Sequence, residues 1–230
     1  MATRYVAFVP ARGGSKGVPR KNLQVVGQHS LLERAVLSGQ GSTRVSACYV
    51  SSDDDEILKK ATELGALAHR RREEASTDVA RASQVMDDFL ASHDELGPED
   101  RIVYLQPTSP FRTFEHVDTA IELMESRGAD AVVGVVRSYQ LPEKTLAISG
   151  SGALELGSGG GDPGSNRQDL AASVYPNGAL YIFSVGAFRE QGDIPVIGAY
   201  PFLMGKVESL DIDDPEDLIL ARGVAASAGI

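Results

Sequence analysis

Short apolar runs alternate with amphipathic segments along the chain as far as Val136. A short apolar run bounded by turn residues is typical of a buried strand, whereas apolar residues three and four positions apart indicate a helix. The runs predict strands at Tyr5–Val9, Ala47–Ser51, Ala66–His69, Arg101–Leu105 and Ala129–Val136. The amphipathic segments predict helices at Ser30–Ser38, Asp55–Leu64, Ala80–Ser92 and Thr113–Ser126. This alternation predicts an α/β fold, in which a mainly parallel sheet carries helices on both faces.

The pattern changes after Val136. Thr145–Ile148 and Ala153–Leu156 flank the sequence Ser-Gly-Ser-Gly and predict a hairpin. A stretch rich in glycine follows at 157–164, and such a stretch cannot pack a core. We therefore expect a β-rich arm that protrudes from the domain over about 138–176.

The C-terminal part returns to the earlier pattern. It predicts strands at Ala179–Phe183 and Ile197–Phe202, and a helix at Pro215–Ala225 that begins with proline, a residue favoured at the first helical position. With 230 residues, of which 42% are hydrophobic, the chain can form one sizeable core but leaves too little for a second. A single domain spanning residues 1–230 is therefore predicted.

The chain is acidic, with a formal net charge of −10. This balance argues against nucleic acid or an anionic membrane as a partner. One cysteine, Cys48, excludes a disulfide within the chain. No apolar run approaches the roughly 18 residues that a membrane-spanning helix needs, so we expect a cytoplasmic protein.

A cluster of positive charge stands out against this acidic background. Directly after the first predicted strand, the segment 10–22 reads Pro-Ala-Arg-Gly-Gly-Ser-Lys-Gly-Val-Pro-Arg-Lys-Asn and holds four cations and three glycines. Ligands of open α/β sheets bind at the carboxyl ends of strands. Glycines such as Gly13 and Gly14 let backbone N–H groups approach an anion, while Arg and Lys compensate its charge. The segment is neither a Walker A loop nor a G-x-G-x-x-G loop, yet it predicts binding of a triphosphate.

Two carboxylates near the C-terminus predict a metal site. Asp211 and Asp213 are two residues apart, so on an extended segment both side chains point to the same side. Mg²⁺ takes few protein carboxylates and completes its shell with water and phosphate oxygens. We therefore predict that this pair binds Mg²⁺ (or Mn²⁺), whereas Asp214, Glu216 and Asp217 belong to the start of the following helix.

Three long motifs resemble those of the acylneuraminate cytidylyltransferases, also called CMP-sialic acid synthetases. They are the segment 10–22, the sequence Leu-Gln-Pro-Thr-Ser-Pro-Phe-Arg at 105–112, and the acidic segment 209–217. Shorter similarities extend the resemblance along nearly the whole chain and lie at 51–57, 70–78, 142–144 and 167–182. The resemblance implies a three-layer α/β/α nucleotidyltransferase domain, Rossmann-like and GT-A-like. It also implies a homodimer in which the arm reaches the partner's site.

The resemblance implies roles for individual residues. The predicted nucleotide-binding residues are Arg12, Gly13, Gly14, Ser15, Lys16, Lys21, Asn22, Arg71 and Ser83. The predicted acceptor-binding residues are Gln106, Thr108, Ser109, Lys144, Arg167 and Tyr181. The chain departs from the family pattern at Arg72, where proline is usual, and at Ala75, where leucine is usual, so the backbone conformation there stays open.

The implied reaction is a direct displacement. The hydroxyl of an acidic 2-keto sugar attacks the α-phosphorus of CTP, and pyrophosphate leaves. Asp211 and Asp213 would hold the metal that bridges phosphate oxygens. Arg12, Lys16 and Lys21 would stabilise the charge that develops on the triphosphate, so the predicted catalytic residues are these three and Asp211.

Three other interpretations stay open. The first is a cytidylyltransferase for another acid, such as a legionaminate, a pseudaminate, an octulosonate or a phosphonate. The second is a glycosyltransferase, because Asp211-Ile212-Asp213 is also a D-x-D motif. The third is a regulator that binds CTP without turnover. Release of pyrophosphate from CTP separates the first interpretation from the other two.

Overall fold

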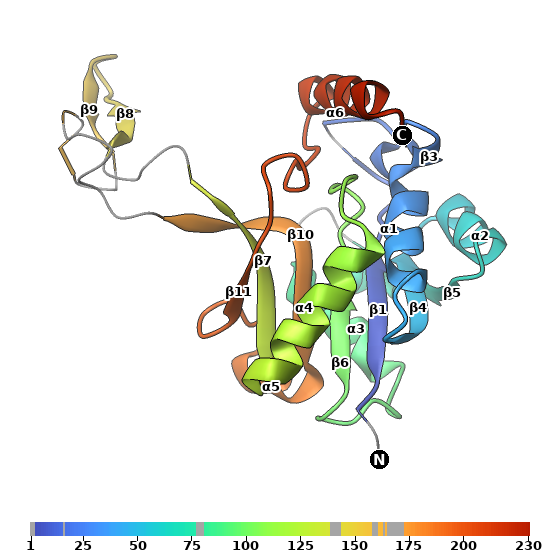
Figure 1. Ribbon diagram of the computed structural model, residues 1–230. Helices are drawn as coiled ribbons and strands as arrows, with labels where there is room; N and C mark the ends of the chain where they lie inside the picture. Colours follow the sequence, from blue (N-terminus) through green and yellow to red (C-terminus); the bar gives the residue numbers. More distant parts are fainter. Residues whose placement is uncertain are drawn as a thin grey trace.

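The computed structural model describes residues 3–15, 17–76, 81–138, 144–157, 161–162, 164 and 173–230. Its centre is a seven-stranded sheet of order β11-β7-β10-β6-β1-β4-β5 (Figure 1). The strands are β1 (Tyr5–Pro10), β4 (Val45–Ser52), β5 (Leu67–Arg70), β6 (Arg101–Tyr104), β7 (Ala131–Arg137), β10 (Val174–Ser184) and β11 (Tyr200–Leu203). Within this sheet only β10 runs against its neighbours, so the mainly parallel sheet that the sequence predicts is confirmed.

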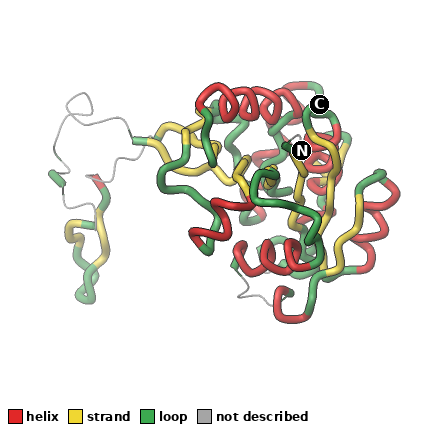
Figure 2. The backbone as a smooth tube through the Cα atoms, turned by 90° about the horizontal axis from the view of Figure 1, so that it is seen from below, coloured by secondary structure: helices red, strands yellow, loops and turns green. Residues whose placement is uncertain are grey.

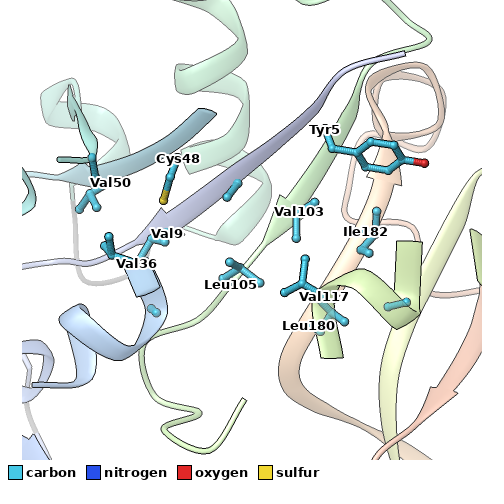
Figure 3. Close-up of a cluster of buried hydrophobic side chains, with 14 of the residues drawn as sticks. Tyr5, Val9, Val36, Cys48, Val50, Val103, Leu105, Val117, Leu180 and Ile182 are labelled. Atoms are coloured by element: carbon cyan, nitrogen blue, oxygen red, sulfur yellow. The ribbon is translucent and has the colours of Figure 1, made fainter. Parts of the chain in front are cut away.

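Helices cover both faces of the sheet. The helices are α1 (Leu31–Gln40), α2 (Asp55–Glu63), α3 (Ala82–Ala91), α4 (Phe114–Arg127), α5 (Val185–Gln191) and α6 (Pro215–Ala228). Alternate residues of β1 separate two cores, because successive side chains of a strand point to opposite faces. Val9 packs with α1, α2 and α4, whereas Phe8 packs with α3 and α5. Figure 3 shows the first core, in which Val36 of α1 lies beside Val9 of β1 and Val117 of α4 lies near Val103 of β6.

A third, smaller core anchors α6. Leu218 and Ala221 of this helix pack on Val26 and Ile212. Val26 belongs to a short pair of strands, β2 (Val25–Val26) and β3 (His29–Ser30), which the sequence pattern did not predict. Short 3-10 turns, η1 (Lys21–Leu23) and η2 (Glu73–Ala75), complete the described elements. Because Val18 also belongs to the third core, this core joins the basic segment 10–22 to the acidic segment 209–217.

Two strands differ from the prediction. β10 begins at Val174 rather than Ala179 and shifts its register between Pro176 and Tyr181. The Pro-Asn-Gly sequence within it is typical of a turn, which is why its first half escaped the pattern. β11 begins only at Tyr200, because Gly198 has a φ of +88° and breaks the extended backbone before it. The helix α5 was not predicted at all.

The β-rich arm contains a pair of antiparallel strands, β8 (Leu146–Ile148) and β9 (Leu154–Leu156), as the sequence predicts. Figures 1 and 2 show this pair well apart from the seven-stranded sheet. In the described part of the chain, no helix is both long and apolar enough to cross a membrane.

Candidate functional site

A cavity of about 310 Å³ lies at the carboxyl edge of the sheet. Segments that follow β1, β5 and β6 form its walls, together with the acidic segment before α6. The predicted site residues that line it are Arg12, Gly14, Ser15, Lys21, Asn22, Arg71, Gln106, Thr108, Asp211 and Asp213. Pro10, Ala82, Val85, Tyr104 and Pro107 also line it, and the sequence had not assigned them to the site.

The two neighbouring glycines of the basic segment have different environments. The N–H of Gly13 donates to Asp53 Oδ1 at 2.9 Å, and a Cβ at this position would lie 2.7 Å from the Cβ of Asp54. A Cβ at Gly14 would meet no atom within 4 Å. Gly13 thus fits the segment against the turn after β4, whereas Gly14 leaves the wall of the cavity open.

Asn22 and Lys21 fix the end of the basic segment. Asn22 is buried, and its Nδ2 donates to the carbonyl of Arg12 at 2.8 Å. Lys21 Nζ donates to the carbonyl of Ile212 at 2.8 Å and lies 3.3 Å from Asp213 Oδ1. The basic segment and the acidic segment, almost two hundred residues apart in sequence, therefore meet directly through Lys21.

The two carboxylates of the acidic segment have unequal surroundings. Asp213 is exposed, whereas Asp211 Oδ1 is buried and has no hydrogen-bond partner in the described part of the chain. Burial raises the pKa of Asp211, the Thr108 side chain opposes that shift, and the nearby charge of Asp213 adds to it. A buried carboxylate oxygen without a donor suits a cation.

The two carboxylates are a small donor set for the predicted Mg²⁺. Among the described residues, no group of three or more His, Cys, Asp or Glu side chains could hold a metal ion. Two carboxylates are nevertheless enough for Mg²⁺, because it keeps several waters and binds substrate phosphates. Asp211 and Asp213 therefore fit this ion when a triphosphate supplies the remaining oxygens.

Arg112 supports the segment 105–112 from beneath. Its buried guanidinium donates through Nη1 to the carbonyls of Gln106 at 2.9 Å and Ala179 at 2.6 Å, and through Nε to Ser38 Oγ at 3.0 Å. Burial lowers the pKa of Arg112 to about 9. The carbonyl of Thr108 accepts from the N–H of Ile212 at 2.9 Å, so this segment also braces the acidic one.

A bulge in β10 packs against Gln106, which lines the cavity. Asn177 is buried, accepts from the N–H of Ala179 at 3.0 Å and donates to Ser209 Oγ at 2.8 Å. Gly178 has a φ of +75°, and a Cβ there would lie 2.8 Å from Gln106 Oε1. The sequence Asn177-Gly178 is typical of a turn, and its position directly before the predicted strand Ala179–Phe183 was the signal that could have indicated a bulge.

Arg71 brings a buried positive charge to the cavity. Its Nε donates to Ser51 Oγ at 3.0 Å and its Nη2 to the Ser51 carbonyl at 2.9 Å. Burial lowers the pKa of Arg71, while nearby Tyr104 and Asp53 oppose that shift. The end of β4 therefore holds the Arg71 side chain, which lines the cavity.

Five predicted residues are described but do not line the cavity. Gly13 lies against Asp53 and Asp54. Ser109 is buried, with no partner for its Oγ among the described residues. In α3 the neighbours Ala82 and Val85 line the cavity in place of Ser83. Tyr181 packs edge-on against Tyr104 at 6.1 Å between ring centroids.

Lys144, the fifth, belongs to the arm and precedes β8. Lys16 and Arg167 lie outside the described residues. The roles predicted for these seven residues stay predictions.

Comparisons with known proteins agree with this architecture. A family model described as cytidylyltransferase matches residues 6–149. An N-acylneuraminate cytidylyltransferase of Streptococcus agalactiae serotype V is 30% identical over 223 residues, which cover 95% of this chain and 52% of that protein. An N-acylneuraminate cytidylyltransferase A of Danio rerio is 31% identical over 207 residues, which cover 90% of this chain and 47% of that protein. The chain thus spans about half the length of these relatives.

A solved structure supports the fold. CMP:2-keto-3-deoxy-manno-octonic acid synthetase complexed with CTP matches with a TM-score of 0.69 and 16% identity, over 98% of this chain and 100% of that chain. The predicted three-layer nucleotidyltransferase fold is therefore confirmed, and so is the predicted resemblance to acylneuraminate cytidylyltransferases.

Proposed function

The chain belongs to the cytidylyltransferase family, and from this premise we propose that it transfers CMP from CTP to the hydroxyl of an acidic 2-keto sugar of the sialic-acid type. Pyrophosphate is the second product. One observation carries the proposal: the basic segment and the carboxylate pair line a single cavity at the carboxyl edge of the sheet, joined by Lys21.

The phosphate side of the site rests on fixed donors. Arg12, Lys21 and Arg71 bring positive charge to the cavity of a chain whose net charge is −10. Lys21 and Arg71 are held by hydrogen bonds to protein groups, so they need little rearrangement when the triphosphate binds. Preorganised charges of this kind stabilise the negative charge that develops on a leaving pyrophosphate.

Asp211 and Asp213 would hold Mg²⁺ or Mn²⁺. When bound, such an ion supplies Lewis-acid stabilisation of charge on phosphate oxygens. The burial of Asp211 next to Thr108 keeps one carboxylate in a fixed orientation, while the exposed Asp213 also contacts Lys21. The protein thus offers a rigid ligand and an adjustable one.

Gln106 and Thr108 form the acceptor side of the proposed site. Both line the cavity, and both belong to the segment that Arg112 and Ile212 brace. The acceptor hydroxyl loses its proton to solvent, and its oxygen forms a bond to the α-phosphorus as the bond to pyrophosphate breaks. Because this displacement depends on positioning and charge, no covalent intermediate with the enzyme is required.

We also infer a homodimer built through the arm. Ile148 and Leu154 of the β8–β9 pair are 77% and 70% exposed. An isolated two-stranded pair is marginal in water, and clustered exposed apolar side chains mark interfaces. In light scattering, Leu154→Asp should lower the mass from dimer to monomer. Ile219→Asp, at a position of α6 that is 69% exposed, should leave the mass unchanged. A monomeric mass of the unaltered protein would contradict the inference.

The activity is tested by pyrophosphate release from CTP and Mg²⁺ across a panel of acceptors. The panel holds N-acetylneuraminate, a legionaminate, a pseudaminate, an octulosonate and simple phosphonates. Release with N-acetylneuraminate supports the proposal, and release only with another acid keeps the reaction but changes the substrate. CTP binding without release on any acceptor favours the regulator, and absence of CTP binding contradicts the proposed function.

A further inference from the structure

A chain of buried polar side chains runs from Arg71 at the cavity to Asp88 in α3. Its members are Arg71, Ser51, His69 and Asp88, which are 9%, 0%, 6% and 8% exposed. Polar groups are rarely buried together unless they hydrogen-bond one another. These four side chains, the polar array, cross the ends of β4 and β5 and join the site to α3. This helix packs on the opposite face of the sheet from α1.

The donors and acceptors along this chain fit one arrangement of hydrogens. Arg71 Nε can only donate, so Ser51 Oγ accepts from it at 3.0 Å. The Ser51 hydroxyl then has its own hydrogen to give, and His69 Nδ1 lies 3.0 Å away. A neutral His69 that accepts at Nδ1 carries its proton on Nε2, which has no hydrogen-bond partner among the described residues. Asp88 Oδ2 is 3.8 Å from Nε2, beyond hydrogen-bond distance but close enough for electrostatic attraction. Burial lowers the pKa of His69, which favours this neutral form.

Arg72 fixes the far end of the chain. Its N–H donates to Asp88 Oδ2 at 3.1 Å, and its Nε lies 2.8 Å from Asp88 Oδ1. Acylneuraminate cytidylyltransferases usually carry proline at this position, and proline has neither an N–H nor a charged side chain. The departure that the sequence showed at Arg72 therefore supplies both contacts that hold Asp88.

We propose that Ser51, His69 and Asp88 are positioning residues that hold the guanidinium of Arg71 in the orientation in which it binds the CTP. The inference rests on the proposed function, because it assigns these residues to the nucleotide part of that site. An arginine side chain has many rotamers, and a binding site gains affinity when its donors are ordered before the ligand arrives. Ser51 supplies that order through two acceptor atoms, and His69 directs the Ser51 hydroxyl.

Calorimetric titration with CTP and Mg²⁺ tests the proposal. Ser51→Ala removes only the shared hydroxyl, and His69→Phe keeps an aromatic ring but removes the acceptor. Ser51→Ala should weaken CTP binding about tenfold, the loss expected for one hydrogen bond to a charged group. His69→Phe should weaken it about fivefold, the loss expected for one hydrogen bond between neutral groups. In turnover assays the KM for CTP should rise by a similar factor, while kcat at saturating CTP should stay within about twofold.

Three further variants separate positioning from general damage to the fold. His93→Phe is the matched control, because the His93 ring packs on Phe89 in the same cluster and its Nδ1 bonds the Phe89 carbonyl rather than Ser51 or Arg71. This variant should leave CTP affinity unchanged. His69→Asn returns an acceptor near Nδ1 and should restore most of the affinity. In an Arg71→Ala background, Ser51→Ala should cause no further loss, because coupled residues are not additive.

Unchanged CTP affinity in both Ser51→Ala and His69→Phe, with the unaltered protein binding CTP, would overturn the positioning role and leave the proposed function intact. If Ser51→Ala lowers CTP affinity equally in the unaltered protein and in the Arg71→Ala background, the positioning role is overturned as well. If the unaltered protein binds no CTP, the proposed function fails first. The hydrogen bonds of the polar array are then tested without nucleotide, by nitrogen-15 NMR. The Arg71 Nε–H proton should exchange slowly with solvent in the unaltered protein, and it should exchange faster in Ser51→Ala than in His93→Phe. Equal exchange rates in those two variants would contradict the claim that Ser51 holds the Arg71 guanidinium.

Discussion

Two aspartates at opposite ends of the sheet show how differently one side chain can be used. Asp100 precedes β6 at the amino edge and accepts from the N–H, Nε and Nη2 of Arg4 and from the N–H of Gly97, at 2.6–3.1 Å. These bonds, above all those of the Arg4 side chain, lower the pKa of Asp100. Asp211 at the carboxyl edge is also largely buried, but one of its oxygens has no partner in the described part of the chain, and burial raises its pKa.

The two aspartates differ in what their surroundings favour: Asp100 is placed for stability of the fold, and Asp211 is placed to meet a ligand. The carboxylate of Asp100 is stabilised by the fold and in turn stabilises it. The carboxylate of Asp211 is desolvated without full compensation, which destabilises the fold unless a ligand supplies the missing contacts. Substitution of Asp211 should therefore lower activity and not stability, whereas substitution of Asp100 should lower stability and not activity.

The largest effect is expected at Asp211. Asp211→Asn keeps the size of the side chain but removes a proposed metal ligand, so turnover of CTP should fall about a thousandfold. The midpoint of thermal unfolding should stay the same or rise, because the variant no longer buries a charge. Pyrophosphate release and differential scanning calorimetry measure the two quantities. Normal turnover, or a large fall in the unfolding temperature, would contradict the contrast between the two edges.

Asp100→Asn should show the converse. Loss of the charged acceptor of Arg4 should lower the free energy of unfolding by about 1–2 kcal/mol, since solvent around Arg4 screens part of the interaction. Turnover at a temperature where the variant is folded should match that of the unaltered protein. Urea unfolding and the pyrophosphate assay give the two values, and a variant that loses turnover while keeping its stability would break the comparison.

The stability that Asp100 contributes also has a defined pH window. Because its pKa is lower in the folded than in the unfolded state, the contribution is present above the ordinary value of 3.8. The contribution is lost as pH falls through the lowered pKa of Asp100. The difference in free energy of unfolding between the unaltered protein and Asp100→Asn should therefore vanish in that range. Urea unfolding from pH 7 down through pH 3.8, to the most acidic pH at which the protein still folds, measures it. A difference that is independent of pH would exclude Asp100 as its source.

The smallest effect is expected at a glycine of the carboxyl edge. Gly178→Ala puts a Cβ at a φ of +75° and 2.8 Å from Gln106 Oε1, so it should destabilise the fold by about 1 kcal/mol and lower kcat/KM for the acceptor about tenfold. Gly128→Ala is the matched control, with a φ of +58° and no atom within 4 Å of the new Cβ. It should lose similar stability but keep its activity. Equal kcat/KM values for the two variants would show that Gln106 is not displaced.

The sequence predicted the motifs at the carboxyl edge of the sheet better than it predicted the contacts that hold those motifs in place. The motifs at 10–22, 105–112 and 209–217 each carry their chemistry within about a dozen residues, so they could be recognised without the fold. Strand periodicity then put two of them at strand ends, and the structure brings all three to one cavity. The contacts of Arg112 with Gln106 and Ala179 join residues far apart in the chain, and no local pattern indicates them.

Other differences have local causes. The phase of α3 brings Ala82 and Val85, rather than Ser83, to the cavity, and a helix start cannot be fixed within one or two residues from a pattern. The reversed direction of β10 leaves no trace in its apolar alternation, because that alternation is the same in parallel and antiparallel strands. α5 has only seven residues, too few for a clear helical period.

The most direct test of the proposed function is phosphorus-31 NMR of the unaltered protein with CTP, Mg²⁺ and N-acetylneuraminate. Direct displacement at the α-phosphorus predicts that CTP disappears as pyrophosphate and one new CMP ester appear in equal amounts. No reaction in Asp211→Asn would tie this chemistry to the carboxyl edge. Release of inorganic phosphate with CDP, or pyrophosphate without the ester, would contradict transfer of CMP to the acceptor.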